Sequence, residues 1–531
     1  EAKRELGTDN IIKLASNENP HGPSPKAIEA LMNSASDFHR YPDSSGFYLR
    51  KKLAKKFNLQ VDNVVIGAGS EGIMSTIMRT FLLNDDELIS AKDSFIGFRV
   101  LANSSGRKIN WVPMKQHRYD LDRMATKITD YTKIIYIANP DNPMGTYITK
   151  KEFDLIIFGG SGFTGKLVLE YMSEKYSHLN WAVAGRNLEK LTKIVEDLKI
   201  NKPILELDSS NTKNVENVLG KTKMLLTTVG PYQLHGNEII STCCKLGVHY
   251  VDLCGEPGWM FEMQKYNENA KNSGAIIVHS CGFDSIPSDC GVYFLQKKAI
   301  EKFQKPLSQI KCRVRKMKGE FSGGTAASLK ATLHAMRKNP DLFNTLINPF
   351  ALCEGFNGPT QPTDHKMYFD EVLDEWVSPF VMAAINTKNV HRTNFMLGHL
   401  YGEDFLYDEM VSCGSGDEGK ARAEAMSSHN PLIGKDVPKP GEGPSRESRE
   451  SGSYDMLFAG IENNKIMIQA SVKGEGDPGY LSTSRMIVES ALCILLDCED
   501  LNGGIFTTIP AMGDKLISRL ERNEVMKFSL E

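Results

Sequence analysis

Short hydrophobic runs alternate with amphipathic stretches along residues 154–290. The runs are DLIIF, WAVAG, PILELD, KMLLTTVG, GVHYVDL and GAIIVHS, and their length and apolar character predict buried strands. Between the first two runs, a helical spacing places four apolar residues on one face: Leu167, Val168, Tyr171 and Met172. This alternation predicts an α/β fold with a doubly wound parallel sheet, which binds ligands at the carboxyl ends of its strands.

Residues 1–153 carry a second set of predicted elements. SPKAIEALMNSA has the apolar spacing of a helix, with Ser24 as its N-cap and Pro25 at its first position. NVVIGAGSEGIMSTIMRTFL predicts a short strand, a glycine-rich turn and a helix, whose free amides from Gly69 onward could hold a phosphate. KIIYIANPDNPMGT predicts a strand that runs into a turn. Taken singly, a strand, turn and helix of this kind more often form only a connection.

Composition also separates the two parts of the chain. Residues 1–153 carry 22 Lys and Arg against 18 Asp and Glu, whereas the remainder carries 41 against 48. All ten cysteines lie between Cys243 and Cys498. We therefore expect two segments of different origin. The cysteines show no paired CxxC spacing, so we expect buried thiols in a reducing cytoplasm and no metal site.

Charge and hydropathy disfavour several classes of protein. The net charge of −3 favours neither a nucleic-acid partner nor an anionic membrane surface. The apolar runs are shorter than the roughly 18 residues that a membrane helix needs, and no signal peptide follows Glu1. A cytoplasmic protein without a transmembrane segment is expected.

The first strand of the later segment ends in a glycine-rich turn, GGSGFTG. Its GxxGxxG spacing allows a tight turn, close approach of a pyrophosphate and packing of the following helix on the strand. The predicted cofactor cradle consists of Gly159, Ser161, Gly162, Phe163, Thr164 and Gly165. Arg186 follows the second strand where NAD enzymes place an acid, and a guanidinium there suits a 2′-phosphate. NADP(H) is therefore predicted as the cofactor, with a plain surface arginine as the alternative.

Several residues that follow the later strands lie at the edge where a ligand is expected. These residues are Asp208, Val229, Gly230, Pro231, Tyr232, Glu256, Asp284, Ser285 and Asp289. The aspartate after the third strand is placed to approach the adenine, and the turn after the fourth strand is placed to face the nicotinamide. Glu256, Asp284 and Ser285 are predicted to contact substrate, although the last two would equally suit helix capping. His249 and His279 lie within apolar strands and are interpreted as core residues.

The first segment resembles histidinol-phosphate aminotransferase, a pyridoxal-phosphate enzyme of fold type I. The resemblance rests on KLASNENPHGPSPKAI, RYPDSSGFYLRKKLAKKF, VVIGAGSEGI and ANPDNPMGT, in this order and spacing. It implies a partial aminotransferase-like domain over residues 1–153. It also implies cofactor contacts by Tyr41, Gly69, Ser70, Glu71, Phe98 and Asn142. Transamination needs a lysine that follows the Asn-Pro turn in this family, and no such region is found here, so we do not expect a working aminotransferase.

The later segment resembles the saccharopine dehydrogenase-like oxidoreductases, near the trans-acting enoyl reductases. GGSGFTG, WAVAGRN, TVGPY, YVDLCGE, GFDSIPSD and FSGGTAAS carry the resemblance, which extends to VKGEGDPGYLSTSRMIVESALCILL. It implies an NADP-binding Rossmann domain over residues 154–290 and a mixed α/β substrate domain over residues 291–490. Residues 491–531 are then a C-terminal return element. Residues 434–455, rich in Pro, Gly and Ser, predict a long exposed loop.

Hydride transfer also needs a group that stabilises charge or donates a proton on the substrate. Tyr232 and Thr325 are the candidate proton donors. We therefore expect an NADP-dependent oxidoreductase that acts on a C=C or C=N bond of a small-molecule or lipid-like substrate. A pyridoxal-phosphate aminotransferase and a non-catalytic nucleotide sensor remain the alternatives, and a homodimer is left open. The junction near residue 153 lacks a Gly/Ser linker, which favours a rearranged chain over two working domains.

Overall fold

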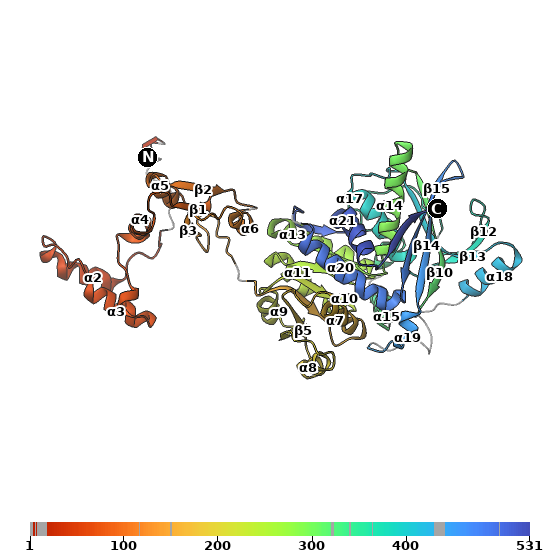
Figure 1. Ribbon diagram of the computed structural model, residues 1–531, viewed down its shortest axis with the longest axis horizontal. Helices are drawn as coiled ribbons and strands as arrows, with labels where there is room; N and C mark the ends of the chain where they lie inside the picture. Colours follow the sequence, from red (N-terminus) through yellow and green to blue (C-terminus); the bar gives the residue numbers. More distant parts are fainter. Residues whose placement is uncertain are drawn as a thin grey trace. The chain divides into compact units, whose positions relative to one another are not determined.

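The computed structural model describes residues 4–5, 7, 18–115, 117–148, 151–319, 323–338, 341–363, 365–428, 441–498 and 500–531. The chain forms two compact units, which Figure 1 shows in the order of the sequence. Unit 1 is Glu1–Tyr147 and unit 2 is Ile148–Glu531. Each unit is described by itself below.

Unit 1 contains a small parallel sheet, and its helices precede the first strand or connect consecutive strands. Its strands are β1 (Glu87–Ala91), β2 (Lys108–Val112) and β3 (Thr132–Tyr136), in the order β2-β1-β3. The helices are α2 (Pro25–Ser34), α3 (Phe47–Phe57), α4 (Gly69–Phe81), α5 (Ile96–Ser104) and α6 (Leu121–Ala125). The predicted cap of α2 is confirmed, because Ser24 Oγ accepts a hydrogen bond from the amide of Ala27 at 3.2 Å.

The strand predicted before the glycine-rich turn of unit 1 is not formed. Val61–Asn63 is a short 3-10 helix, and the residues that lead to α4 are irregular. Val65 and Ile66 are 70% and 41% exposed, so this apolar run has no sheet to join. A strand needs a neighbour to satisfy its amides and to cover its apolar face, and propensity alone does not supply one.

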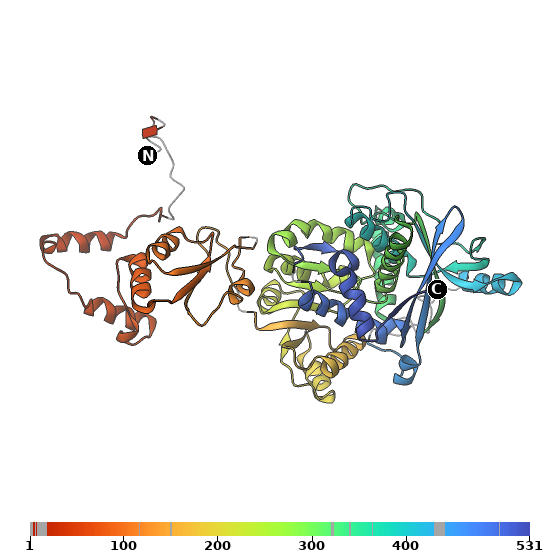
Figure 2. The ribbon, with the colours of Figure 1, turned by 45° about the horizontal axis from the view of Figure 1, so that its top comes forward.

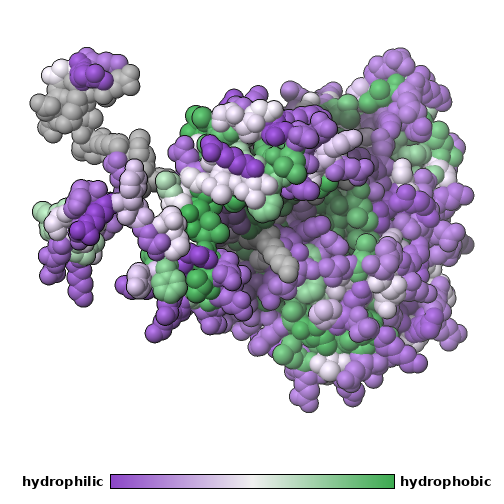
Figure 3. Space-filling model, turned by 60° about the vertical axis from the view of Figure 1, so that its left-hand side comes forward, coloured by the Kyte–Doolittle hydropathy of each residue, from purple (hydrophilic) through white to green (hydrophobic). Residues whose placement is uncertain are grey.

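Unit 1 buries little of its hydrophobic surface. Its core cluster consists of Met78, Leu82, Leu88, Phe98 and Ala102. Many large apolar side chains are exposed instead, among them Ile28, Leu31, Met32, Phe38, Phe47, Phe57, Phe81, Ile96, Val100 and Ile135. Figure 3 shows hydrophobic and hydrophilic residues interspersed on one face of the protein. A folded domain normally covers such surface, so unit 1 has the composition of a domain without the burial of one.

Unit 2 begins with the predicted Rossmann sheet, whose seven strands are all parallel. The strands are β4 (Phe153–Phe158), β5 (Trp181–Gly185), β6 (Ile204–Glu206), β7 (Thr222–Thr227), β8 (His249–Val251), β9 (Ile276–Val278) and β16 (Gly504–Phe506), in the order β16-β9-β8-β7-β4-β5-β6. Figure 2 shows helices on both faces of this sheet. The six predicted strands and the doubly wound topology are confirmed, whereas β16 comes from a distant part of the chain.

Helices connect the Rossmann strands in the predicted alternation. They are α7 (Phe163–Lys175), α8 (Leu188–Asp197), α9 (Thr212–Leu219), α10 (Tyr232–His235), α11 (Asn237–Leu246), α12 (Pro257–Met263) and α13 (Asn267–Ser273). The four apolar residues predicted to share one face of α7 are all buried. The pattern identified this helix because its core-facing side chains recur with a helical period.

A second sheet of seven strands forms the rest of unit 2. Its strands are β10 (Gln309–Lys318), β11 (Tyr368–Asp370), β12 (Glu375–Pro379), β13 (Leu406–Gly414), β14 (Ser453–Glu462), β15 (Lys465–Glu475) and β17 (Lys527–Leu530), in the order β11-β12-β13-β10-β14-β15-β17. The pair β10–β13 is parallel and the other neighbours are antiparallel. The implied mixed α/β architecture is therefore confirmed.

Further helices pack around this second sheet and between the two sheets. They are α14 (Ile286–Phe303), α15 (Gly323–Lys338), α16 (Asp341–Ile347), α17 (Ala383–Met396), α18 (Gly416–Ser427), α19 (Arg446–Glu450), α20 (Thr483–Leu496) and α21 (Thr508–Arg522). One continuous hydrophobic cluster includes Leu155 of the first sheet and Phe458 of the second. The two sheets of unit 2 therefore share a single core.

The C-terminal part of the chain returns to the Rossmann sheet. Helix α20 packs on α7 and on strands β7 and β8, and β16 then joins the sheet beside β9. Because α20 is continuous from Thr483 to Leu496, a boundary at residue 490 would divide a helix. The stretch Pro478–Leu496 is long and apolar enough to cross a membrane by composition, but 72% of it is buried inside unit 2. Its burial is that of a core helix.

The loop predicted at residues 434–455 is only partly described. Gly441 is in a turn, residues 442–445 have no regular secondary structure, α19 follows over Arg446–Glu450, and β14 begins at Ser453. The prediction of a loop that extends to residue 455 is therefore wrong for the second half of this stretch. The polar composition that predicted a loop comes here from an exposed short helix whose N-cap is Ser445.

A buried carboxylate fastens the returning helices to α7. Glu489 on α20 accepts hydrogen bonds from the hydroxyls of Tyr171 and Tyr176, each at 2.7 Å. It also accepts from Arg519 Nε at 2.7 Å and from Asn523 Nδ2 at 3.0 Å. Glu489 is fully buried and Arg519 is 4% exposed. Four donors from two helices therefore meet on one carboxylate of a third.

We expect Glu489→Ala to lower the free energy of unfolding of unit 2 by about 3–5 kcal/mol, because it removes one of the two carboxylates that pair with the buried Arg519, the other being Asp497, and leaves the hydroxyl of Tyr171 without its acceptor. Urea denaturation followed by circular dichroism measures the change. Glu301→Ala removes an exposed ion pair with Lys298 and should cost less than about 1 kcal/mol. Equal losses in the two variants would contradict this role of Glu489.

Candidate functional site

A cavity of about 600 Å³ lies at the carboxyl edge of the Rossmann sheet in unit 2. One part of its wall is the predicted cofactor cradle, from Gly159 to Gly165. Another part comes from the second domain and is formed largely by hydrophobic side chains. The side chains from the second domain are Met317, Leu329, Leu333, Met336, Leu346, Val381, Met382 and Ile385, and Leu253 and Phe283 of the Rossmann domain adjoin them. The two domains therefore enclose one continuous space.

The cofactor cradle depends on a close backbone approach. Gly159 has φ of +105°, a conformation that a side chain disfavours. A Cβ at Gly165 would overlap the carbonyl oxygen of Gly159, so α7 can pack on the turn only if position 165 is glycine. Gly162 is the N-cap residue of α7, and its amide donates to the carbonyl of Gly159 at 2.9 Å. The first amides of a 13-residue helix thus point toward the cavity, as a pyrophosphate requires.

Arg186 and Asp208 lie beyond the cavity wall, at the ends of β5 and β6. Arg186 is exposed and follows the last residue of β5. Two hydrogen bonds from Ser210 lower the pKa of Asp208, and the charge of Arg186 lowers it further. The strand register pairs Gly185 with Glu206, so Arg186 and Asp208 follow neighbouring strand ends, and Asp208 is the residue that was predicted to approach the adenine. The structure therefore brings these two predicted residues together.

The turn after β7 forms the other side of the cradle. Thr228, Val229 and Gly230 line the cavity, and Pro231 is the N-cap residue of α10. The ring of Tyr232 also reaches the cavity, but its hydroxyl donates to the carbonyl of Thr227 at 3.3 Å and accepts from the amide of Leu253 at 3.0 Å. Burial raises the pKa of Tyr232 well above its usual value. These pairings favour a structural role for this tyrosine over proton donation.

Glu256 is buried behind the cavity wall and binds three donors. Its carboxylate accepts from the amides of Tyr232 and Gln233, each at 2.9 Å, and from Ser328 Oγ at 2.6 Å. It therefore satisfies free amides at the start of α10 and holds α15 against the Rossmann domain. The sequence predicted that Glu256 contacts the substrate. In the structure its carboxylate instead binds α10 and α15 and is not part of the cavity lining.

Three further predicted polar residues have different surroundings. Ser285 is the N-cap residue of α14, yet its hydroxyl bonds the side chains of Asn386 and Asn389 on α17 and makes no capping bond. Asp289 is buried, accepts from Thr508 Oγ1 and the amide of Ile509, and burial raises its pKa to about 6. Asp284 lines the cavity. Only Asp284 of these three reaches the candidate site.

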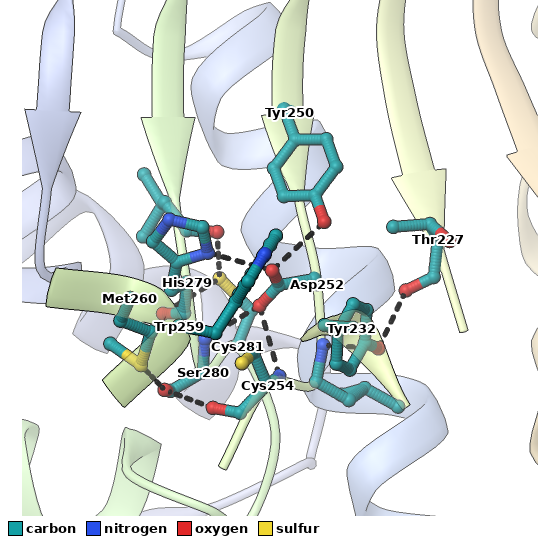
Figure 4. A network of polar contacts seen from close by, with 12 residues as sticks. Thr227, Tyr232, Tyr250, Asp252, Cys254, Trp259, Met260, His279, Ser280 and Cys281 are labelled. Carbon is teal, nitrogen blue, oxygen red and sulfur yellow. Dashed lines mark hydrogen bonds and ion pairs between the residues drawn. The ribbon is translucent and has the colours of Figure 1, made fainter. Parts of the chain in front are cut away.

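The network behind this edge of the sheet centres on Asp252, which the sequence analysis did not single out (Figure 4). Its carboxylate accepts from Tyr250 OH and from the amides of Cys254 and Ser280, and it pairs with His279 Nδ1 at 2.7 Å. His279 is therefore a partnered core histidine, as interpreted. His249 likewise accepts from the amide of Ile276 at 3.1 Å. A buried acid directly after a strand was the signal available in YVDLCGE.

The segment that follows the undescribed part of the 434–455 stretch covers the cradle. Gly441 and Glu442 line the cavity, and a Cβ at Gly443 would overlap the ring of Phe163. Arg449 lies over the same ring, 5.2 Å from its centroid. Tyr480 contacts Phe163 edge to face, and its hydroxyl donates to the carbonyl of Glu442. The side chain of the candidate donor Thr325, in α15, lies outside the described residues.

The six residues implied to hold pyridoxal phosphate do not form a site in unit 1. Phe98 is 3% exposed and stacks on Tyr136, with ring centroids 3.5 Å apart, so it is a core residue and its ring does not face a ligand. Tyr41 is fully exposed, and Gly69, Ser70 and Glu71 start α4 at the surface. A cavity of about 300 Å³ in unit 1 is lined by Asn84, Asp85, Asp86, Glu87, Gly106, Arg107, Lys108 and Tyr131. Asn142 and the other five implied residues are not part of this lining.

Comparison with known proteins separates the chain at the same junction. Residues 9–157 match the family of class I and II aminotransferases, and residues 155–278 match the NADP-binding domain of saccharopine dehydrogenase. A Mycobacterium tuberculosis protein of the trans-acting enoyl reductase family is 35% identical over 402 residues, which cover 70% of this chain and 96% of the relative. Both resemblances seen in the sequence are thus confirmed.

Two solved structures are similar to parts of the chain. Histidinol-phosphate aminotransferase from Sinorhizobium meliloti, with pyridoxal-5′-phosphate, is 21% identical with a TM-score of 0.26, over 34% of this chain and 46% of that chain. Saccharopine dehydrogenase (L-Glu forming) from Saccharomyces cerevisiae is 11% identical with a TM-score of 0.37, over 71% of this chain and 100% of that chain.

We expect Gly165→Ala to destabilise unit 2 and to abolish binding of the dinucleotide, because the new methyl group would force α7 away from the turn. The matched variant Gly162→Ala should fold normally, since its Cβ would stand 3.4 Å from the nearest atom, the Gly159 carbonyl oxygen. Thermal denaturation without ligand compares the two variants. Equal melting temperatures would show that the close approach at position 165 is not a constraint.

Proposed function

The chain belongs to the trans-acting enoyl reductase family, and we propose that unit 2 is an NADPH-dependent reductase that saturates a carbon–carbon double bond of a lipid-like substrate. The observation that carries the proposal is the single cavity of about 600 Å³, which joins the dinucleotide cradle to a predominantly apolar chamber. A reductase needs its cofactor cradle and its substrate chamber to be continuous, because the nicotinamide and the substrate must meet in a space closed to water.

The residues of unit 2 fit a nicotinamide dinucleotide. The amides at the start of α7 would bind the pyrophosphate, and the missing side chain at Gly162 lets it approach the backbone, while Gly159 and Gly165 allow the turn and the close packing of α7 on it. Val229 and Gly230, on the cavity wall after β7, would lie beside the nicotinamide. When bound, NADPH supplies the hydride of the reaction. The protein then has to orient the substrate, exclude water and provide a proton.

The lining of the chamber supports a lipid-like substrate over an amino-acid-derived one. Among the described lining residues there is no Lys, Arg or His. An amino-acid imine carries a carboxylate, which proteins usually hold with a paired basic group. A chamber formed by leucine, methionine, valine and isoleucine side chains instead stabilises an aliphatic chain by burying it. A C=C bond next to such a chain is therefore favoured over a C=N bond.

Arg186 should select NADPH over NADH. We expect Arg186→Ala to weaken NADPH binding by about 10- to 100-fold, the loss of a charge-assisted bond worth about 1.5–3 kcal/mol, and to leave NADH binding nearly unchanged. Calorimetric titration of both cofactors into the full chain measures this. Lys213→Ala, on α9, is a control that also removes one positive charge near the third strand. An unchanged NADPH preference in Arg186→Ala would refute the assignment of Arg186.

The match of residues 9–157 to aminotransferases makes transamination the second candidate function. The residues do not fit pyridoxal phosphate, because the Phe98 ring is already stacked in the core and the other implied contacts face no described cavity. The region that carries the lysine in that family is also replaced by the Rossmann domain. The geometry of unit 1 therefore favours a non-catalytic segment.

We expect no specific capture of pyridoxal phosphate by the full chain. Incubation with the cofactor, borohydride reduction and peptide mapping should label no lysine above the level seen for exposed lysines in general. One lysine modified stoichiometrically would support the aminotransferase alternative. The same chain should bind NADPH, so a result negative for both cofactors would instead point to a misfolded preparation.

A further inference from the structure

Four titratable side chains line the described part of the cavity: Tyr232, Asp284, Glu442 and Tyr480. The hydroxyl of Tyr232 is bound to Thr227 and Leu253, as described above. The hydroxyl of Tyr480 accepts from the amide of Gly323 and donates to the carbonyl of Glu442. Glu442 itself is exposed to water. Asp284 is the remaining acid, and it is half-buried in the wall.

The position of Asp284 suits contact with a substrate. It follows β9 and precedes α14, at the carboxyl edge of the Rossmann sheet where the predicted nicotinamide half would lie. Its oxygens occupy space that glycines leave open, because Oδ1 lies 3.9 Å from the place of a Cβ at Gly255 and Oδ2 lies 3.0 Å from that of a Cβ at Gly282. The surrounding wall includes Leu253, Phe283 and Met317. The carboxyl group thus stands in a mostly apolar part of the cavity.

The electrostatic surroundings keep a proton on this carboxyl group. Burial and, to a smaller extent, the neighbouring carboxylate of Asp252 raise the pKa of Asp284 to about 7. The titratable groups that interact with Asp284 are Asp252, Tyr232, Cys254 and Cys281, and none of these four is a cation. Asp252 is held in place by its own donors from β8 and β9. Near neutral pH a substantial fraction of Asp284 is therefore protonated.

We propose that Asp284 is the catalytic acid of the reductase and delivers the proton from its carboxyl oxygen to the α-carbon of the substrate double bond. This assignment rests on the proposed function. The hydride from bound NADPH and this proton together reduce the C=C bond to a single bond, which leaves NADP⁺ and the Asp284 carboxylate. The carboxylate recovers its proton from water after the product leaves. Tyr232 then positions the turn after β7 and donates no proton.

The test uses Asp284→Asn in the full chain, with Asp417→Asn as the matched control. Asp417 is exposed at the start of α18, outside the cavity lining. NADPH binding is measured first by calorimetry, and both variants should bind as tightly as the parent. Turnover is then measured with a medium-chain trans-2-enoyl thioester of N-acetylcysteamine as the probe. We expect kcat to fall by about 10²- to 10⁴-fold in Asp284→Asn and to stay unchanged in the control.

The pH profile gives a readout that a structural role would not change. Since the protonated form is active, kcat of the parent should fall as pH rises through about 7, the pKa raised by burial. The residual activity of Asp284→Asn should lose that dependence, and Asp284→Glu should regain part of the activity together with a pH-dependent profile. A normal kcat in Asp284→Asn, with an unchanged pH profile, would overturn the proposal.

Infrared spectroscopy separates failure of this proposal from failure of the proposed function. The difference spectrum between the parent and Asp284→Asn should contain the C=O stretching band of a protonated carboxyl group, which disappears as pH rises through about 7. If the parent binds NADPH and shows the band but reduces no enoyl thioester, the reaction assigned to unit 2 is wrong, while Asp284 remains a protonated acid in the cavity. Absence of the band at neutral pH overturns the role of Asp284 whatever the turnover.

Discussion

One buried carboxylate, that of Asp252, organises the edge of the sheet at which the candidate site lies. It is 0% exposed and receives donors from its own strand end and from the segment after β9. A buried carboxylate is costly unless such donors surround it, so the two strand ends are fixed together. The same charge acts on Tyr232, Cys281 and Asp284, the last of which faces the cavity. Packing and electrostatics at this edge thus depend on a single side chain that is not among the residues lining the cavity.

The two units of the chain differ in how completely they bury their hydrophobic side chains. Unit 2 joins two seven-stranded sheets through one continuous core, with Trp181 and Tyr250 fully buried. Unit 1 has three strands and a core cluster of five buried residues. Its helix α2 buries none of its residues in the structure described here. An amphipathic sequence pattern can therefore form helices and strands even where the described structure offers no second apolar surface to cover their hydrophobic faces.

The Rossmann half of unit 2 was predictable because its signals are local. Each apolar strand segment, the glycine spacing of the turn and the buried face of α7 can be recognised within fewer than 20 consecutive residues. The strand expected near Val65 failed for the opposite reason, because a strand exists only through a neighbour that the sequence does not specify. The loop predicted through residue 455 failed because an exposed helix and a loop have similar polar composition.

The candidate site could be predicted only in part, because most of its decisive features are contacts between distant segments. The cradle follows from consecutive residues, and its lining of the cavity agrees with the prediction. Glu256 looked like a substrate contact until Ser328, 72 positions later, was found bound to it. Tyr232 looked like a proton donor until its hydroxyl was found paired with Leu253. Sequence spacing shows which polar groups reach an edge of the sheet, but it does not show which of them remain free.

The return of the chain at its C-terminal side has a consequence for biosynthesis. Strand β16 completes the edge of the Rossmann sheet beside β9, and β17 completes the second sheet beside β15, with residues 504–506 and 527–530. Helices α20 and α21, which cover the first sheet, also belong to this late part. Neither sheet of unit 2 can therefore be completed until the ribosome has released these late strands. Unit 1 is translated before unit 2, so its exposed apolar side chains are present while both sheets of unit 2 are still incomplete, a stage at which exposed hydrophobic surface and unpaired strand edges favour aggregation.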